Sequence, residues 1–200
     1  MSEAGIGRIV VASLHQAIAE ALPSRLEFYE NWLTAAGLRG GTIGVAQLNA
    51  VLSFLRREQD AYDVIVRRAG ECAADWTLQS ISGPRRRVIE MLPSWGRARV
   101  ALRMARELVR HGSVRSRAFV RRGPQGTRLE LQHSLFCDVR DAQPFPLCGF
   151  YAAAATRLLD QLNVDGDVAV GRCRGTGHPA CVLDVTVRGP KGRHASVVAA

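Results

Sequence analysis

Three cysteines in the last third of the chain have a spacing that could hold a metal ion. Cys173 and Cys181 flank the glycine- and proline-rich stretch CRGTGHPAC, and 24 residues separate Cys148 from Cys173. A tight turn in that stretch would bring two strand ends together, because glycine permits the backbone angles that turns need. Cys148 stands at the expected start of a helix, where the helix dipole favours a thiolate. Three converging thiolates are typical of a zinc site.

The spacing alone leaves two other interpretations open. The cysteines could form a redox pair, or they could be buried small hydrophobic side chains beside a hairpin turn. Seven residues separate Cys173 from Cys181, which is more than the usual two to four of a zinc knuckle. The chain has five cysteines and no recognisable secretory signal, and an odd number argues against a disulfide framework.

The first half of the chain shows helical spacing of apolar residues. Pro23 should end the first helix, Ser24 could cap the second, and Gly70 should end another. SGPRRR marks a break, after which Ser94 could cap a long helix with one arginine-rich face. That face is either solvated or an anion or partner surface. The predicted helices cover residues 6–22, 24–37, 45–57, 60–69, 71–81 and 95–110.

The second half alternates like strands around one further helix. Strands are expected over 113–122 and 127–137, a helix over 147–162, and strands over 167–173 and 181–187. This order predicts an α+β fold, with an N-terminal helical layer packed on a small four-stranded antiparallel sheet of two hairpins flanking a helix. We expect one domain over residues 1–188, with a helical part at about 6–110, a strand-rich part at about 113–187 and a loose tail at 189–200.

Composition narrows the class of protein. Hydrophobic residues make up 47% and charged residues 22%, as in ordinary globular proteins. The net charge is +9, but Lys191 is the only lysine, and sparse aromatic residues do not alternate with the arginines. We therefore do not expect nucleic-acid binding. No apolar run approaches the ~20 residues of a membrane span, so we expect a soluble, cytoplasmic protein.

The segment LCGFYAAAATRLLDQL…VGRCRGTGHPACVLDV resembles the vinyl-reductase-type (4-vinyl reductase) small-molecule-binding domain family. That family includes the sensory domains of phenol- and toluene-responsive activators and a protein of bacteriochlorophyll biosynthesis. The match rests on Cys148, Cys173, the Gly177-His178-Pro179 turn and Cys181, over about forty residues. The resemblance implies a fold of the NO-signalling and Golgi-transport type, and a dimer.

The resemblance also implies a fourth zinc ligand. The sensors carry an acidic residue three positions before the first hairpin cysteine, where this chain has Val170. Cys137, which is expected to end the second strand, is the first candidate to replace it, and His178 is the second. Four protein ligands would make the zinc a structural staple of the last helix and the last hairpin, fixing one wall of a ligand pocket.

Three functions are compatible with this pattern. The first is a sensor or carrier that binds a hydrophobic or aromatic molecule between the helices and the sheet. Its candidate pocket residues are Trp76, Trp95, Phe119, Phe136, Phe150 and Tyr151, although aromatic residues at such spacings more often pack in the core. The second is an accessory protein or enzyme of tetrapyrrole metabolism, and the third is a protein–protein adaptor like the vesicle-tethering subunits. No nucleophile–base pair can be named, so binding is favoured over catalysis.

Overall fold

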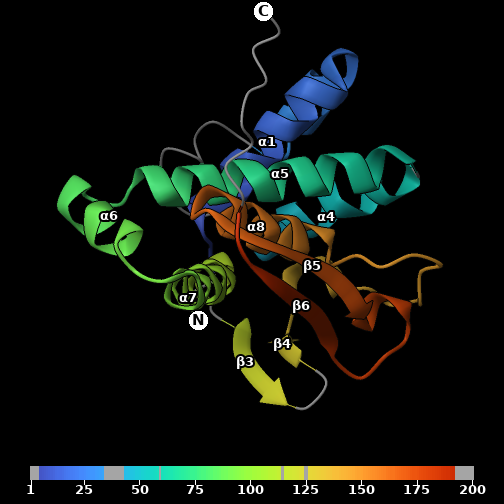
Figure 1. Ribbon diagram of the computed structural model, residues 1–200. Coiled ribbons are helices and arrows are strands. Elements are labelled where there is room, and N and C mark those ends of the chain that lie inside the picture. Colours follow the sequence, from blue (N-terminus) through green and yellow to red (C-terminus); the bar gives the residue numbers. More distant parts are fainter. Residues whose placement is uncertain (1–4, 34–42, 59, 114, 124–125, 192–200) are drawn as a thin grey trace, which may run out of the picture.

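The computed structural model describes residues 5–33, 43–58, 60–113, 115–123 and 126–191 (Figure 1). Helices come first and the main sheet second. The N-terminal part contains β1 (Gly5–Ile6), α1 (Arg8–Ala21), η1 (Pro23–Arg25), α2 (Leu26–Glu30), β2 (Ile43–Gly44), α4 (Val45–Arg57), α5 (Asp60–Gln79), α6 (Gly83–Glu90) and α7 (Ser94–Gly112). The C-terminal part contains β3 (Arg117–Gly123), β4 (Gly126–Gln132), η2 (Leu135–Cys137), α8 (Gly149–Gln161), β5 (Val164–Arg172), η3 (Arg174–Thr176) and β6 (Cys181–Pro190).

The main sheet has four antiparallel strands in the order β3-β4-β6-β5. Two hairpins, β3–β4 and β5–β6, therefore meet through β4 and β6, and Leu131 pairs with Cys181 at that seam. One face is apolar and buried, while on the other Arg128 contacts Asp184 across the strands at 3.0 Å. This alternation is typical of an antiparallel sheet with one covered face.

The helices cover the apolar face in layers (Figure 1). α8 packs on β5 and α7 on β3, and α5 packs on α8 with α1 beyond it. The α+β fold with a helical layer on a four-stranded antiparallel sheet is therefore confirmed. In the described part of the chain, no helix has both the length and the apolar character needed to cross a membrane.

One predicted helix boundary is wrong. Gly70 does not end a helix: α5 runs without interruption from Asp60 to Gln79. A Cβ atom at Gly70 would lie 2.2 Å from the carbonyl oxygen of Phe150 on α8. The glycine thus serves close helix–helix packing, which local helix propensity does not reveal.

Three other predictions need correction. The SGPRRR break contains α6, which begins at Gly83 with Pro84 in its first turn, a position proline tolerates because the first N–H groups of a helix have no partner there. Ser94 lies inside α7 and makes no capping hydrogen bond. The helix predicted at 24–37 is a short 3-10 turn followed by α2, with Ser24 inside the turn; residues 34–37 lie outside the described residues.

The predicted tail begins too early. β6 continues to Pro190, because Gly189 and Pro190 pair with Asp165 and Val164 at the start of β5. Residues 192–200 lie outside the described part of the chain.

Candidate metal centre

Four cysteine sulfurs meet at one buried point. The Sγ atoms of Cys137, Cys148, Cys173 and Cys181 all lie within 4.8 Å of one another. The Sγ atom of Cys137 is 3.0 Å from that of Cys148, 3.3 Å from that of Cys173 and 3.6 Å from that of Cys181. All four are free thiols with at most 2% of their surface exposed.

Cys137 and Cys148 lie at the two ends of the loop that joins η2 to α8. β4 ends at Gln132, and His133, with φ of 51°, turns the chain into η2, whose last residue is Cys137. The prediction that Cys137 ends a strand is therefore wrong, although the residue does join the cluster. Cys148 is the residue immediately before α8, as expected.

The other two sulfurs come from the ends of the β5–β6 hairpin. Cys173 follows the last residue of β5, and Cys181 is the first residue of β6. The connection is a 3-10 turn that ends at Gly177, whose φ of 91° lies in the left-handed region that favours glycine. The N–H of His178 then donates back to the carbonyl of Cys173 at 3.2 Å, closing the turn.

Backbone donors point at two of the sulfurs. The N–H of Leu147 donates to Sγ of Cys173, and the N–H of Arg174 donates to Sγ of Cys181, both at 3.3 Å. Hydrogen bonds to a sulfur favour its thiolate form. The pKa of Cys173 is lowered by hydrogen bonds from Cys137, the other cluster thiols and this backbone N–H. Hydrogen bonding to Cys137 and burial instead raise the pKa of Cys148.

The donor set fits a single tetrahedral ion. Zinc–sulfur bonds of about 2.3 Å place the sulfurs of a four-cysteine site about 3.8 Å apart, close to the separations found here. Thiolates are soft ligands that select zinc, copper(I) or iron. The sulfurs that hold a multi-iron cluster are further apart, because several iron and sulfide atoms lie between them. The four cysteines could therefore hold one metal ion.

Neither of the other positions considered for the fourth ligand contributes. Val170 is half-buried on β5 and pairs with Leu183 of β6. His178 is exposed in the hairpin turn and does not belong to the cluster. Cys137 occupies the fourth place.

Three of the six aromatic pocket candidates form a buried group beside the cluster. The rings of Phe136 and Phe150 stack with their centroids 4.8 Å apart, and Tyr151 meets both of them edge-on. They pack against one another, and at most 2% of each residue is exposed. Trp95 and Phe119 lie at the surface, 60% and 39% exposed.

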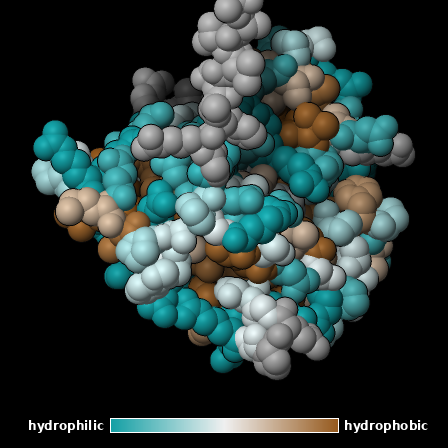
Figure 2. Space-filling model, in the orientation of Figure 1, coloured by the Kyte–Doolittle hydropathy of each residue, from teal (hydrophilic) through white to brown (hydrophobic). Residues whose placement is uncertain are grey.

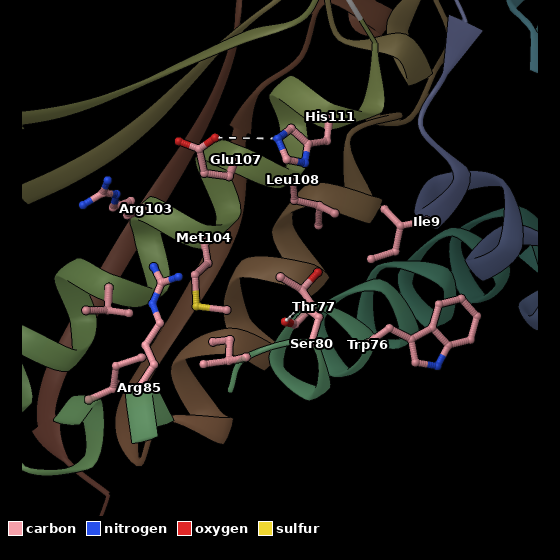
Figure 3. Close-up of a pocket in the computed structure, with 13 residues that line it drawn as sticks. Ile9, Trp76, Thr77, Ser80, Arg85, Arg103, Met104, Glu107, Leu108 and His111 are labelled. Carbon is pink, nitrogen blue, oxygen red and sulfur yellow. Dashed lines mark hydrogen bonds and ion pairs between the residues drawn. The ribbon is translucent and has the colours of Figure 1, made fainter. Parts of the chain in front are cut away.

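The sixth aromatic residue, Trp76, lines a pocket of about 380 Å³ (Figure 3). This pocket lies among α1, α5, α6 and α7, and not between the helices and the sheet. Its lining residues are Ile9, Trp76, Thr77, Ser80, Ile81, Arg85, Ile89, Val100, Arg103, Met104, Glu107, Leu108 and His111. Apart from Trp76, sequence reasoning missed this site. The apolar stripe of α7 was a visible signal, but the helical character of residues 83–90 was not recognised.

Comparison of the chain with family models, with curated proteins and with solved structures found no match. The resemblance to the vinyl-reductase-type family therefore stays a prediction from the sequence.

Proposed function

We propose that this chain is a small-molecule-binding protein, a sensor or carrier, whose fold is stapled by zinc in the four-cysteine cluster. The observation that carries the proposal is the pocket among α1, α5, α6 and α7. It has the size and mainly apolar lining typical of small-molecule sites, which span about 300–1,000 Å³. The resemblance to the sensory domains supports the same function.

In this proposal zinc has a structural role. Four cysteines complete its tetrahedral coordination and leave no open position for a substrate. Structural zinc contributes roughly 10–16 kcal/mol of binding free energy in small peptides, which is comparable with the ~5–15 kcal/mol net stability of a domain. The ion would join η2, the start of α8 and the β5–β6 hairpin.

A chain of contacts connects the metal centre to the pocket. Cys148 precedes α8, and α8 packs closely on Gly70 of α5. Further along, Arg157 of α8 donates two hydrogen bonds to Asp75 of α5, at 2.8 and 3.1 Å. Asp75 directly precedes Trp76, which lines the pocket. Zinc that fixes α8 would therefore also fix the α5 wall of the pocket.

Elemental analysis and native mass spectrometry of untreated protein test both parts of the proposal. We expect about one equivalent of zinc per chain and a hydrophobic small molecule carried through purification. Val100→Phe, which places a ring inside the pocket, should lose the small molecule and keep the zinc. Less than half an equivalent of metal with all thiols open to alkylation would contradict the staple. A small molecule retained equally by Val100→Phe would contradict the pocket.

A second candidate function is a protein–protein adaptor that acts as a homodimer. Large apolar side chains are exposed where α6 leads into α7: Val88 at 62%, Met91 at 85% and Trp95 at 60%. Figure 2 shows hydrophobic and hydrophilic residues side by side where α6 projects from the molecule. A monomer by sedimentation at all concentrations, unchanged by Met91→Glu, would remove this candidate.

A further inference from the structure

We propose that the pocket among α1, α5, α6 and α7 binds a hydrophobic monocarboxylate, with its apolar body between the helices and its carboxylate at Arg85. This inference rests on the proposed small-molecule function and assigns the chemical class of the ligand.

The body of the ligand must be apolar because the walls are. The apolar walls come from three helices and from the turn between α5 and α6, and their residues are Ile9, Ile81, Ile89, Val100, Met104 and Leu108. A volume of about 380 Å³ lies near the lower end of the range for small-molecule sites. This size favours a ligand whose body is a short alkyl chain, a single ring or two fused rings.

The two hydroxyl groups of the lining are already engaged. The hydroxyl of Thr77 donates to the carbonyl of Ala73 at 2.6 Å, and that of Ser80 donates to the carbonyl of Thr77 at 2.7 Å. Both hydroxyl groups therefore already donate their hydrogen to a backbone carbonyl of α5. A ligand with several polar groups would find few free donors among them.

The negative charge of the lining is also compensated. Glu107 contacts Arg110 at 3.2 Å and Arg106 at 3.7 Å, and His111 lies 3.9 Å away on the same side (Figure 3). Two full positive charges thus neutralise this carboxylate. Glu107 leaves no net negative charge that would attract a cationic ligand.

Arg85 and Arg103, by contrast, form no ion pair among the described residues. Figure 3 shows the Arg85 side chain extending from α6 toward Met104 on α7, whereas Arg103 points away from the other labelled residues. Among the described residues that line the cavity, the guanidinium group of Arg85 is therefore a cation without an ion-pair partner that extends toward the apolar wall. A guanidinium group binds a carboxylate through two parallel hydrogen bonds, and it cannot lose its charge at neutral pH. An anionic head group on an apolar body matches this arrangement.

Matched acids and alcohols test the assignment by isothermal titration calorimetry. The probes are decanoate against decanol, and 2-naphthoate against 2-naphthalenemethanol. We expect each acid to bind at least tenfold more tightly than its alcohol at low salt. Arg85→Met should weaken the acids about tenfold and leave the alcohols unchanged, since one charge-assisted hydrogen-bonded contact is lost. Arg87→Met changes an exposed arginine of α6 outside the pocket, and it should bind all four probes like the unaltered protein.

The possible outcomes distinguish a wrong ligand class from a wrong proposed function. If acids and alcohols bind alike and Arg85→Met changes neither, the anionic class is wrong while small-molecule binding stands. If none of the four probes binds and Val100→Phe also leaves the purified protein's small-molecule content unchanged, the proposed function fails as well. If decanoate binds and naphthoate does not, or the reverse, the class stands and the shape of the apolar body is decided.

Discussion

The guanidinium group of Arg56 on α4 donates a hydrogen bond of 3.1 Å to the carbonyl oxygen of Phe136 in η2. Phe136 directly precedes Cys137, so this contact ties a helix of the N-terminal half to the segment that carries one of the four sulfurs. η2 has only three residues and one internal turn. Its position therefore depends on contacts of this kind with its surroundings.

Removing this contact should weaken metal binding without removing a ligand. We predict that Arg56→Met lowers zinc affinity about tenfold, because groups that orient metal ligands typically contribute 10–100-fold in affinity. Competition with a chromophoric chelator measures the change. Arg57→Met alters the exposed neighbour, whose guanidinium lies over the ring of Phe54, and should keep the original affinity. Equal affinities for Arg56→Met and Arg57→Met would show that the Phe136 contact does not position Cys137.

Loss of one sulfur should destabilise the whole domain. We predict that Cys148→Ser lowers the free energy of unfolding by about 3 kcal/mol or more and the zinc content to near zero, because the proposed ion would join three separate segments. A chelator should lower the melting temperature of the original protein and hardly change that of Cys148→Ser. Cys72→Ser provides the control, since Cys72 is a buried cysteine on α5 outside the cluster. It should lose less stability and still respond to the chelator; identical chelator responses in both variants would argue against a structural metal at Cys148.

The close approach of α5 and α8 makes Gly70 sensitive to a single methyl group. Gly70→Ala places Cβ 2.2 Å from the Phe150 carbonyl oxygen and 3.1 Å from the Ala154 nitrogen, so the helices must separate. We predict a loss of about 1–3 kcal/mol in the free energy of unfolding, measured by denaturant titration. Zinc affinity should fall as well, because Phe150 is two residues from Cys148. Gly83→Ala meets no atom within 4 Å and should be neutral or slightly stabilising. A stabilising Gly70→Ala would mean that the two helices pack less closely than described.

The sequence predicted the layers of the fold and the convergence of the cysteines for identifiable reasons. Cys173 and Cys181 stand at the ends of two segments in which apolar and polar residues alternate as in strands. The glycine-rich stretch between them brings the two strand ends together through local turn geometry alone. Cys137 was harder to place. The strand pattern runs on past Gln132, and the positive φ of His133 that ends it depends on local geometry. The correct ligand was therefore assigned to the wrong element.

The parts that sequence reasoning missed depend on contacts between distant segments. Gly70 looks like a helix terminator, and only the Phe150 carbonyl on α8 explains why a glycine is needed inside α5. The pocket lies where four helices meet. The spacing of apolar residues within one helix cannot predict which other helices it will contact. From the sequence, Phe136, Phe150 and Tyr151 were candidates for a pocket but more often expected in the core, and in the structure all three are buried.

All three tyrosines of the chain should resist ionisation while the protein is folded. Burial raises the pKa of Tyr29, Tyr62 and Tyr151 above the ordinary value of about 10. The folded protein then holds these protons at a pH where the unfolded chain has released them. Their contribution to stability is complete below about pH 10 and is lost as the pH rises further, by up to about 1.4 kcal/mol per pH unit for each of Tyr62 and Tyr151 and by less for Tyr29. We therefore predict that the phenolate absorbance band appears together with loss of the far-ultraviolet circular dichroism signal, and not before it.

The variant Tyr62→Phe separates this effect from ordinary packing. The hydroxyl of Tyr62 donates to the carbonyl of Leu147 at 3.3 Å, so at neutral pH its removal should cost about 1 kcal/mol. Above pH 10 the variant has one fewer proton to lose, and its stability should fall less steeply than that of the original protein. The two stability curves should therefore converge as the pH rises. A phenolate band that develops near pH 10 while the circular dichroism signal stays intact would show that at least one of these rings reaches solvent in the folded state.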